Sequence, residues 1–194
     1  MARPPSFDPD QALDAALHLF WRRGWAATSI DELVAATGVP RYSLYARWTD
    51  KRGLYLAALD RYLGAVASAW LVPLRDDDDP VRAVRAVFRG LRDVVVDDPE
   101  RLGCFVLNTM IELGHDPEMH AVVRGVLDQV QGAWRDTLAR AVHTGQLPPD
   151  EPVEARAAHL AMSMQALLLQ ARAAPSPEAI DQFVALTLAF LPQE

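Results

Sequence analysis

Cysteine is almost absent from this 194-residue sequence, which contains only Cys104. A single thiol cannot form an internal disulfide, so a disulfide framework is excluded and a reducing compartment is expected. No stretch free of charged residues reaches the roughly 20 residues that a membrane span needs. The N-terminal residues also lack the apolar run of a secretory signal. We therefore expect a cytoplasmic protein with no membrane partner.

The motifs of common enzyme chemistry are missing as well. There is no glycine-rich phosphate loop and no nucleophile motif. His115 and His120 are five residues apart and would not share a helix face, so we predict no metal site and no cofactor. The acidic run 76–79 fits an exposed loop leading into a helix, and Cys104 is interpreted as a small buried residue rather than a sensor. These absences argue against an enzyme.

Lysine is the other rare residue, since the chain has 18 arginines and only one lysine, Lys51. The net charge of −7 would disfavour nucleic acid if it were evenly spread. It is not, because residues 1–52 carry +1 and the remainder carries −8. Four cations lie between positions 41 and 52, opposed there only by Asp50. Since screening hides charges beyond about 8 Å, this patch can bind phosphates. A nonspecific architectural DNA binder would be basic overall and is disfavoured.

The apolar residues, 51% of the chain, recur with helical spacing, and neither a strand pattern nor an internal repeat is present. Asp8 and Pro9 predict a first helix start, and Gly24 predicts its end. We expect an all-α fold of about nine helices. After the first, they are expected at about 30–37, 41–47, 51–70, 80–97, 103–114, 117–143, 151–173 and 177–191.

Two of these helices are short and separated by a glycine-containing turn, which is typical of a helix-turn-helix. Ser29 and Glu32 form a capping box for the first, which ends at Gly38. In the second, Leu44 is the apolar anchor. The other side chains between 41 and 51 are largely cations and hydroxyls, which suit guanine edges and phosphates in a major groove.

These segments resemble the TetR/AcrR family of transcriptional regulators. The resemblance rests on residues 19–24 (LFWRRG), 27–39 (ATSIDELVAATGV) and 43–51 (SLYARWTDK), and it spans about residues 9–60. It implies a TetR-type DNA-binding domain at 6–66, with the helix-turn-helix at about 29–48. It also implies a C-terminal ligand-binding and dimerisation domain at 67–194.

The resemblance further implies roles for individual residues. Arg41 and Tyr42 would read base edges, and Arg47 would touch a base or a phosphate. Phosphate contacts would come from Ser43, Tyr45 and Lys51, while Ser29 is either a phosphate contact or only a helix cap. Three positions depart from the family pattern and bear on the operator sequence: Pro40 replaces a Ser or Thr cap, Tyr42 a small residue and Asp31 a cation.

For the C-terminal part, the resemblance implies a helical body with an apolar pocket whose filling changes the spacing of two DNA-binding heads. The candidate pocket residues, for which ordinary core packing is the alternative, are Phe88, Phe105, Asn108, Met110, Trp134 and Met162. The helix at 151–173 is apolar nearly all round and must be covered on both sides, so we expect a second copy of the chain to cover one of them. The candidate dimer residues are Leu160, Met164, Leu167, Leu168, Ile180, Phe183 and Val184.

The function expected from these observations is a homodimeric repressor that binds a pseudo-palindromic double-stranded operator and is released by a small apolar effector. The alternative is a helical small-molecule-binding protein or enzyme without DNA binding.

Overall fold

The protein is all-helical, as expected, in a computed structural model that describes residues 7–192. No strand occurs among those residues. The helices are α1 (Pro9–Arg23), α2 (Ile30–Thr37), α3 (Arg41–Trp48), α4 (Lys51–Val66), α5 (Val72–Asp76), α6 (Pro80–Asp97), α7 (Phe105–Leu113), α8 (Pro117–His143), α9 (Val153–Gln170) and α10 (Pro177–Thr187). A π-helical segment, Ala67–Leu71, joins α4 to α5 without a break, so the described chain contains nine helical rods.

Local sequence accounts for most of the helix starts. Asp8 caps α1 by accepting from the Asp10 amide at 2.9 Å. The Ser29–Glu32 capping box predicted for α2 is present in both directions. Pro40, by contrast, gives α3 no side-chain cap. The start of α3 therefore depends on packing rather than on a local hydrogen bond.

The rod formed by α4 and α5 is longer than the sequence analysis expected, because it continues past residue 70 to Asp76. Pro73 lies in its last part and has no N–H to donate to the carbonyl of Ala69. One turn earlier the helix widens, and the Val72 amide donates to the Ala67 carbonyl five residues back. The proline thus changes the winding without ending the rod. The predicted domain boundary at 66/67 falls where this change begins.

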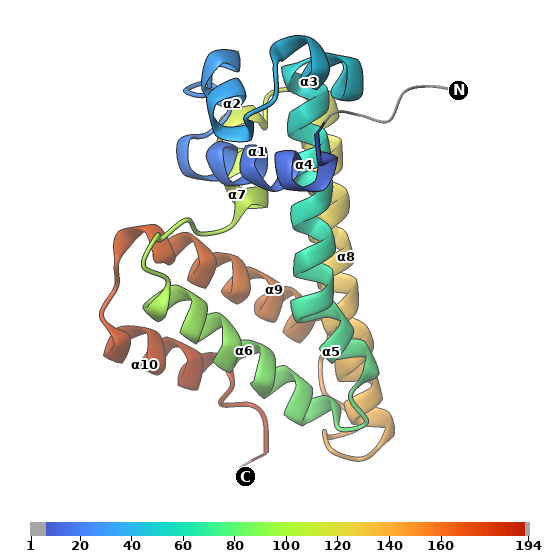
Figure 1. Cartoon of the computed structure of the whole chain (residues 1–194). Helices are drawn as coiled ribbons and strands as arrows, with labels where there is room; N and C mark the ends of the chain where they lie inside the picture. Colours follow the sequence, from blue (N-terminus) through green and yellow to red (C-terminus); the bar gives the residue numbers. More distant parts are fainter. Residues whose placement is uncertain (1–6, 193–194) are drawn as a thin grey trace.

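Figure 1 shows a small head of α1, α2 and α3 at one end and the layered helices α6, α9 and α10 toward the other. The α4–α5 rod runs from the head into the body, where α5 packs on α8. The helix α7 lies beneath the head and joins it to α8. Within residues 7–192, no helix has both the length and the apolar character needed to cross a membrane.

Candidate nucleic-acid interface

The second helix of the predicted helix-turn-helix is held by very few side chains. Gly38 ends α2 in the left-handed region at a φ of 67°. Val39 and Leu44 are then buried and anchor the turn and α3 to the head. Half-buried aromatic rings in the C-terminal half of α3 also pack against the core, and the opposite side of the helix faces outward, with Tyr42 85% exposed. Figure 1 shows α3 at the tip of the head, away from the body.

The structure brings the predicted DNA-contacting residues together at this tip. Arg41 and Arg47 of α3 are exposed, and Ser43 and Tyr45 are half-buried. Ser29, at the start of α2, is exposed, but its hydroxyl donates to Glu32 at 2.9 Å and accepts from the Glu32 amide. The capping role of Ser29 is therefore confirmed, while the phosphate contacts stay predictions.

Arg41 is the base-reading candidate with a competing partner. Its guanidinium donates to Asp31 at 3.0 Å, and both side chains are largely exposed. Exposed ion pairs of this kind contribute about 0–1 kcal/mol, so DNA can displace Asp31 at little cost. The acidic residue that departs from the family pattern thus restrains Arg41 before binding.

Lys51, for which a phosphate contact is predicted, does not extend freely into solvent. Its ammonium group donates to the carbonyl oxygen of Trp25 at 2.5 Å and lies 4.3 Å from the centre of the Trp25 ring. The pKa of Lys51 is lowered, because the effect of burial exceeds the opposite effect of the Glu112 and Glu32 carboxylates. No sequence pattern indicates the Trp25 contact, because that residue belongs to the loop after α1.

Arg52 was counted with the basic patch, and that assignment is wrong. Its guanidinium faces the body, where it donates to both oxygens of Asp116 at 2.9 Å and to Glu118 at 2.6 Å. These bonds, together with the amides at the start of α8, hold the pKa of Asp116 well below its usual range. Arg52 therefore joins the head to α8 instead of facing DNA.

Comparison with known proteins fits this geometry. Two family models match: "Bacterial regulatory proteins, tetR family" over residues 12–58, and "Tetracyclin repressor-like, C-terminal domain" over residues 80–187. The HTH-type transcriptional repressor ComR of Escherichia coli is 32% identical, over 98% of this chain and 92% of its own. The chain belongs to the TetR family.

Two further relatives resemble this TetR-family chain along nearly all of its length. The HTH-type transcriptional regulator YezE of Bacillus subtilis is 30% identical over 98% of this chain and 100% of its own. A cysteine mutant of the TetR family regulator CifR, solved with 26-base-pair operator DNA, superposes with a TM-score of 0.85 at 27% identity, covering 98% of this chain and 100% of that one. This TetR-family chain is a DNA-binding transcriptional regulator and not an enzyme.

The TetR-type body contains an apolar cavity of about 290 Å³ directly beneath the head. Leu17 and Trp21 of α1 contribute to its wall, so the cavity touches the DNA-binding head itself. Burial raises the pKa of both Tyr62 and Cys104, which keeps these two lining groups neutral. The other lining residues are Ala65, Val66, Ala69, Trp70, Val94, Gly103, Val106, Leu107, Val126, Leu127, Val130, Met164, Gln165 and Leu168.

The six pocket residues expected from the sequence do not line this cavity, so that assignment is wrong for it. Phe88, Phe105 and Trp134 are fully buried in helix packing. Met162 is 67% exposed on the outside of α9. Asn108 and Met110 are half-buried on α7, where the Asn108 amide donates to the Leu102 carbonyl at 3.2 Å.

Most of the expected dimer residues face the interior of their own chain. Five of them are buried within their own chain and are not free to meet a second copy: Leu160, Met164, Leu167, Leu168 and Ile180. Of these five, Met164 and Leu168 line the cavity. Val184 is half-buried and Phe183 is 37% exposed. The outward apolar side chains of α9 and α10 are instead Met162, Leu169, Phe183 and Leu186.

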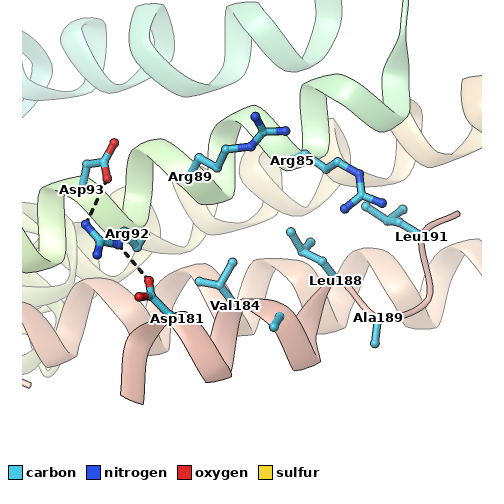
Figure 2. A pocket seen from close by; sticks show the side chains of 10 residues that line it. Arg85, Arg89, Arg92, Asp93, Asp181, Val184, Leu188, Ala189 and Leu191 are labelled. Atoms are coloured by element: carbon cyan, nitrogen blue, oxygen red, sulfur yellow. Dashed lines mark hydrogen bonds and ion pairs between the residues drawn. The ribbon is translucent and has the colours of Figure 1, made fainter. Parts of the chain in front are cut away.

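A second hollow of about 800 Å³ lies between α6 and α10 (Figure 2). Arg85, Arg89 and Arg92 line its α6 side, and apolar residues of α10 face them. Arg92 donates to Asp181 at 2.9 Å, and Arg85 donates to the carbonyl of Pro192. These bonds tie α6 to α10 and the chain segment after it.

Proposed function

We propose that this regulator is a cytoplasmic, homodimeric repressor that leaves its operator when a small, uncharged, apolar molecule fills the cavity beneath the head. ComR, which matches nearly the whole chain, is a transcriptional repressor. The cytoplasm is where a bacterial operator is accessible.

The proposed dimer uses the outward apolar faces of α9 and α10. Met162, Ala166 and Leu169 follow one another at helical spacing on one exposed side of α9. Leu186 of α10 is 78% exposed, although leucine is normally buried. A two-fold pairing that covers these side chains would present two α3 helices to a pseudo-palindrome.

In the proposed DNA complex, each α3 enters a major groove. Arg41 and Tyr42 contact base edges, since they are the most N-terminal side chains of the helix and are exposed. Ser43, Tyr45, Arg47 and Lys51 contact phosphates or neighbouring bases and fix the register. Ser29 lies at the N-terminus of α2, where a phosphate would also be favoured.

The observation that carries the ligand proposal is the composition of the cavity wall. Among the described residues, no charged side chain lines the cavity, and the polar side chains that line it are uncharged: Gln165, Tyr62, Cys104 and the indoles of Trp21 and Trp70. A charged ligand would therefore lose its hydration without gaining a partner. The volume of the cavity, about 290 Å³, lies at the lower end of the range for small-molecule sites.

The route from cavity to DNA is short. Leu17 and Trp21 belong to α1, which packs on α2 and α4 within the head. A ligand that binds one orientation of α1 relative to α7 better than another shifts the population toward it. The resulting rotation of each head would change the distance between the two α3 helices.

The neutral fluorescent probe N-phenylnaphthylamine tests this proposal. We expect its fluorescence to rise on binding and the complex to bind DNA from the region upstream of the protein's own gene more weakly. Val126→Phe should abolish both effects, because Val126 lines the cavity, and should keep DNA binding. Val122→Phe, one turn earlier on α8 and outside the lining, is the matched control. Probe binding that is unaffected by Val126→Phe, or that leaves DNA affinity unchanged, would refute the proposal.

A further inference from the structure

A carboxylate of the body reaches into the DNA-binding head. Glu112, in the last turn of α7, accepts hydrogen bonds from the amides of Trp25 at 2.7 Å and Ala26 at 3.0 Å. Both carboxylate oxygens are used, one for each amide. Without Glu112, these two loop amides would lose the side-chain acceptor that holds them.

The loop after α1 is shaped to admit this carboxylate. Gly24 has a φ of 83° and a ψ of 174°, a region that only glycine adopts readily. A Cβ at position 24 would lie 2.6 Å from a carboxylate oxygen of Glu112. The glycine that ends α1 therefore also makes room for the side chain from α7.

The residue held by Glu112 is the one that holds Lys51. The N–H of Trp25 donates to Glu112, while its carbonyl accepts from the Lys51 ammonium at 2.5 Å. The Trp25 ring lies under the same ammonium and packs edge-on against Tyr55, with 5.2 Å between ring centres. The position of the Trp25 peptide thus determines where the Lys51 charge lies.

Lys51 keeps the capacity to bind DNA in this position. An ammonium group has three donors, and Trp25 takes one of them. The other two remain for a phosphate oxygen. Because the lysine side chain is otherwise flexible, holding it in place before binding lowers the entropy cost of the contact.

We propose that Glu112 is a positioning residue for DNA binding: through the Trp25 peptide it places Lys51 against the DNA backbone. The inference rests on the phosphate contact proposed above for Lys51. It extends the DNA-binding machinery to a residue of α7, the helix whose Val106 and Leu107 line the cavity.

The test measures affinity for a random-sequence DNA duplex at several salt concentrations, using the full-length protein and its Lys51→Ala, Glu112→Ala and double variants. A phosphate contact needs no particular sequence, so the operator need not be known. Lys51→Ala should make the slope of log affinity against log salt shallower by roughly 1 per protomer. Glu112→Ala should weaken binding about tenfold and move the slope in the same direction. In the Lys51→Ala background, Glu112→Ala should change affinity less than about twofold.

Two further variants separate positioning from folding. Glu112→Gln keeps one acceptor oxygen and should recover part of the lost affinity. Asp128→Asn makes the same carboxylate-to-amide change at an exposed site on α8 and should leave binding unchanged. The proposal would be overturned if the fold-losses of DNA affinity caused by Glu112→Ala and Lys51→Ala multiply in the double variant and Glu112→Ala leaves the salt slope unchanged. If Lys51→Ala itself leaves the slope unchanged, the phosphate contact of Lys51 is wrong and the role of Glu112 falls with it, while the proposed repressor function is tested separately by the fluorescent probe.

Discussion

Arg52 and Asp116 form a bidentate ion pair between the head and the body, and both of its hydrogen bonds are 2.9 Å long. Arg52 lies in the first turn of α4, and Asp116 caps α8 by accepting from the amides of Glu118 and Met119. Because one carboxylate serves both purposes, the orientation of α8 is coupled to the start of α4. The pair lies at the head-to-body junction across which any ligand signal must pass.

This pair gives a pH prediction. In the folded state the pKa of Asp116 is lowered, chiefly by its hydrogen bonds to Arg52. The ion pair therefore stabilises the fold at pH values above the ordinary pKa of aspartate, and this stabilisation is lost as the pH falls below it. The difference in melting temperature between the wild type and Arg52→Gln should be constant from neutral pH to about 5 and narrow below about 4. Thermal unfolding followed by circular dichroism measures this.

The control for Arg52→Gln is Arg124→Gln, which removes a solvent-exposed pair with Asp128 four residues on. It should change the melting temperature very little. A difference between the wild type and Arg52→Gln that stays constant to the lowest pH reached would show that Asp116 gains nothing from Arg52.

Gly24 provides a prediction about backbone strain. Gly24→Ala should destabilise the protein by about 1–3 kcal/mol, because the backbone there suits glycine alone and the added Cβ meets Glu112. Gly125→Ala on α8 is the matched control, since nothing lies within 4 Å of its Cβ. In a helix interior this change should stabilise by up to about 1 kcal/mol. Equal effects in urea unfolding would contradict the account.

The exposed apolar face of α9 and α10 predicts an effect on assembly. Met162→Glu and Leu186→Glu should each shift the protein from dimer toward monomer, because a charge would then lie in the buried interface. Light scattering coupled to gel filtration measures the mass. Ile111→Glu changes an equally exposed apolar residue on α7 and should leave the dimer intact. Dimers that persist in both interface variants would place the interface elsewhere.

Substitutions of Arg41 and of Asp31 should have opposite effects on DNA binding. Arg41→Ala should weaken operator binding by about 1–3 kcal/mol and relax selection at one base position. Asp31→Asn should strengthen binding by at most about 1 kcal/mol, because it frees Arg41 from an exposed ion pair. Fluorescence anisotropy with operator and scrambled duplexes measures both. An Arg41→Ala variant with unchanged affinity for both duplexes would remove Arg41 from base recognition.

The helices and the DNA-reading tip could be predicted because the signals are local. The cap at Asp8 and the capping box at Ser29 act on amides two or three residues away. The helix-turn-helix is likewise a continuous segment, in which Leu33, Val39 and Leu44 are the buried apolar side chains. A pattern read along the chain is sufficient for such elements.

The cavity lining and the exposed apolar face of α9 could not be predicted, because α9 is apolar on nearly every side. Leu167 and Met162 are both suitable for the interior, and only the packing of α6 and α8 on α9 decides that Leu167 is buried and Met162 exposed. The contact of Glu112 with Trp25 joins positions 87 residues apart, and that of Arg52 with Asp116 joins positions 64 apart. Neither leaves a periodic pattern in the sequence.

Cations and hydroxyls on α3 and at the start of α4 should bind duplex DNA even though the molecule is acidic. An electrophoretic mobility shift at low salt, with DNA from the region upstream of the protein's own gene, measures this binding. The wild type should form a retarded complex that the double variant Arg41→Ala/Lys51→Ala no longer forms. Absence of retardation by the wild type, or equal retardation by the double variant, would contradict this expectation.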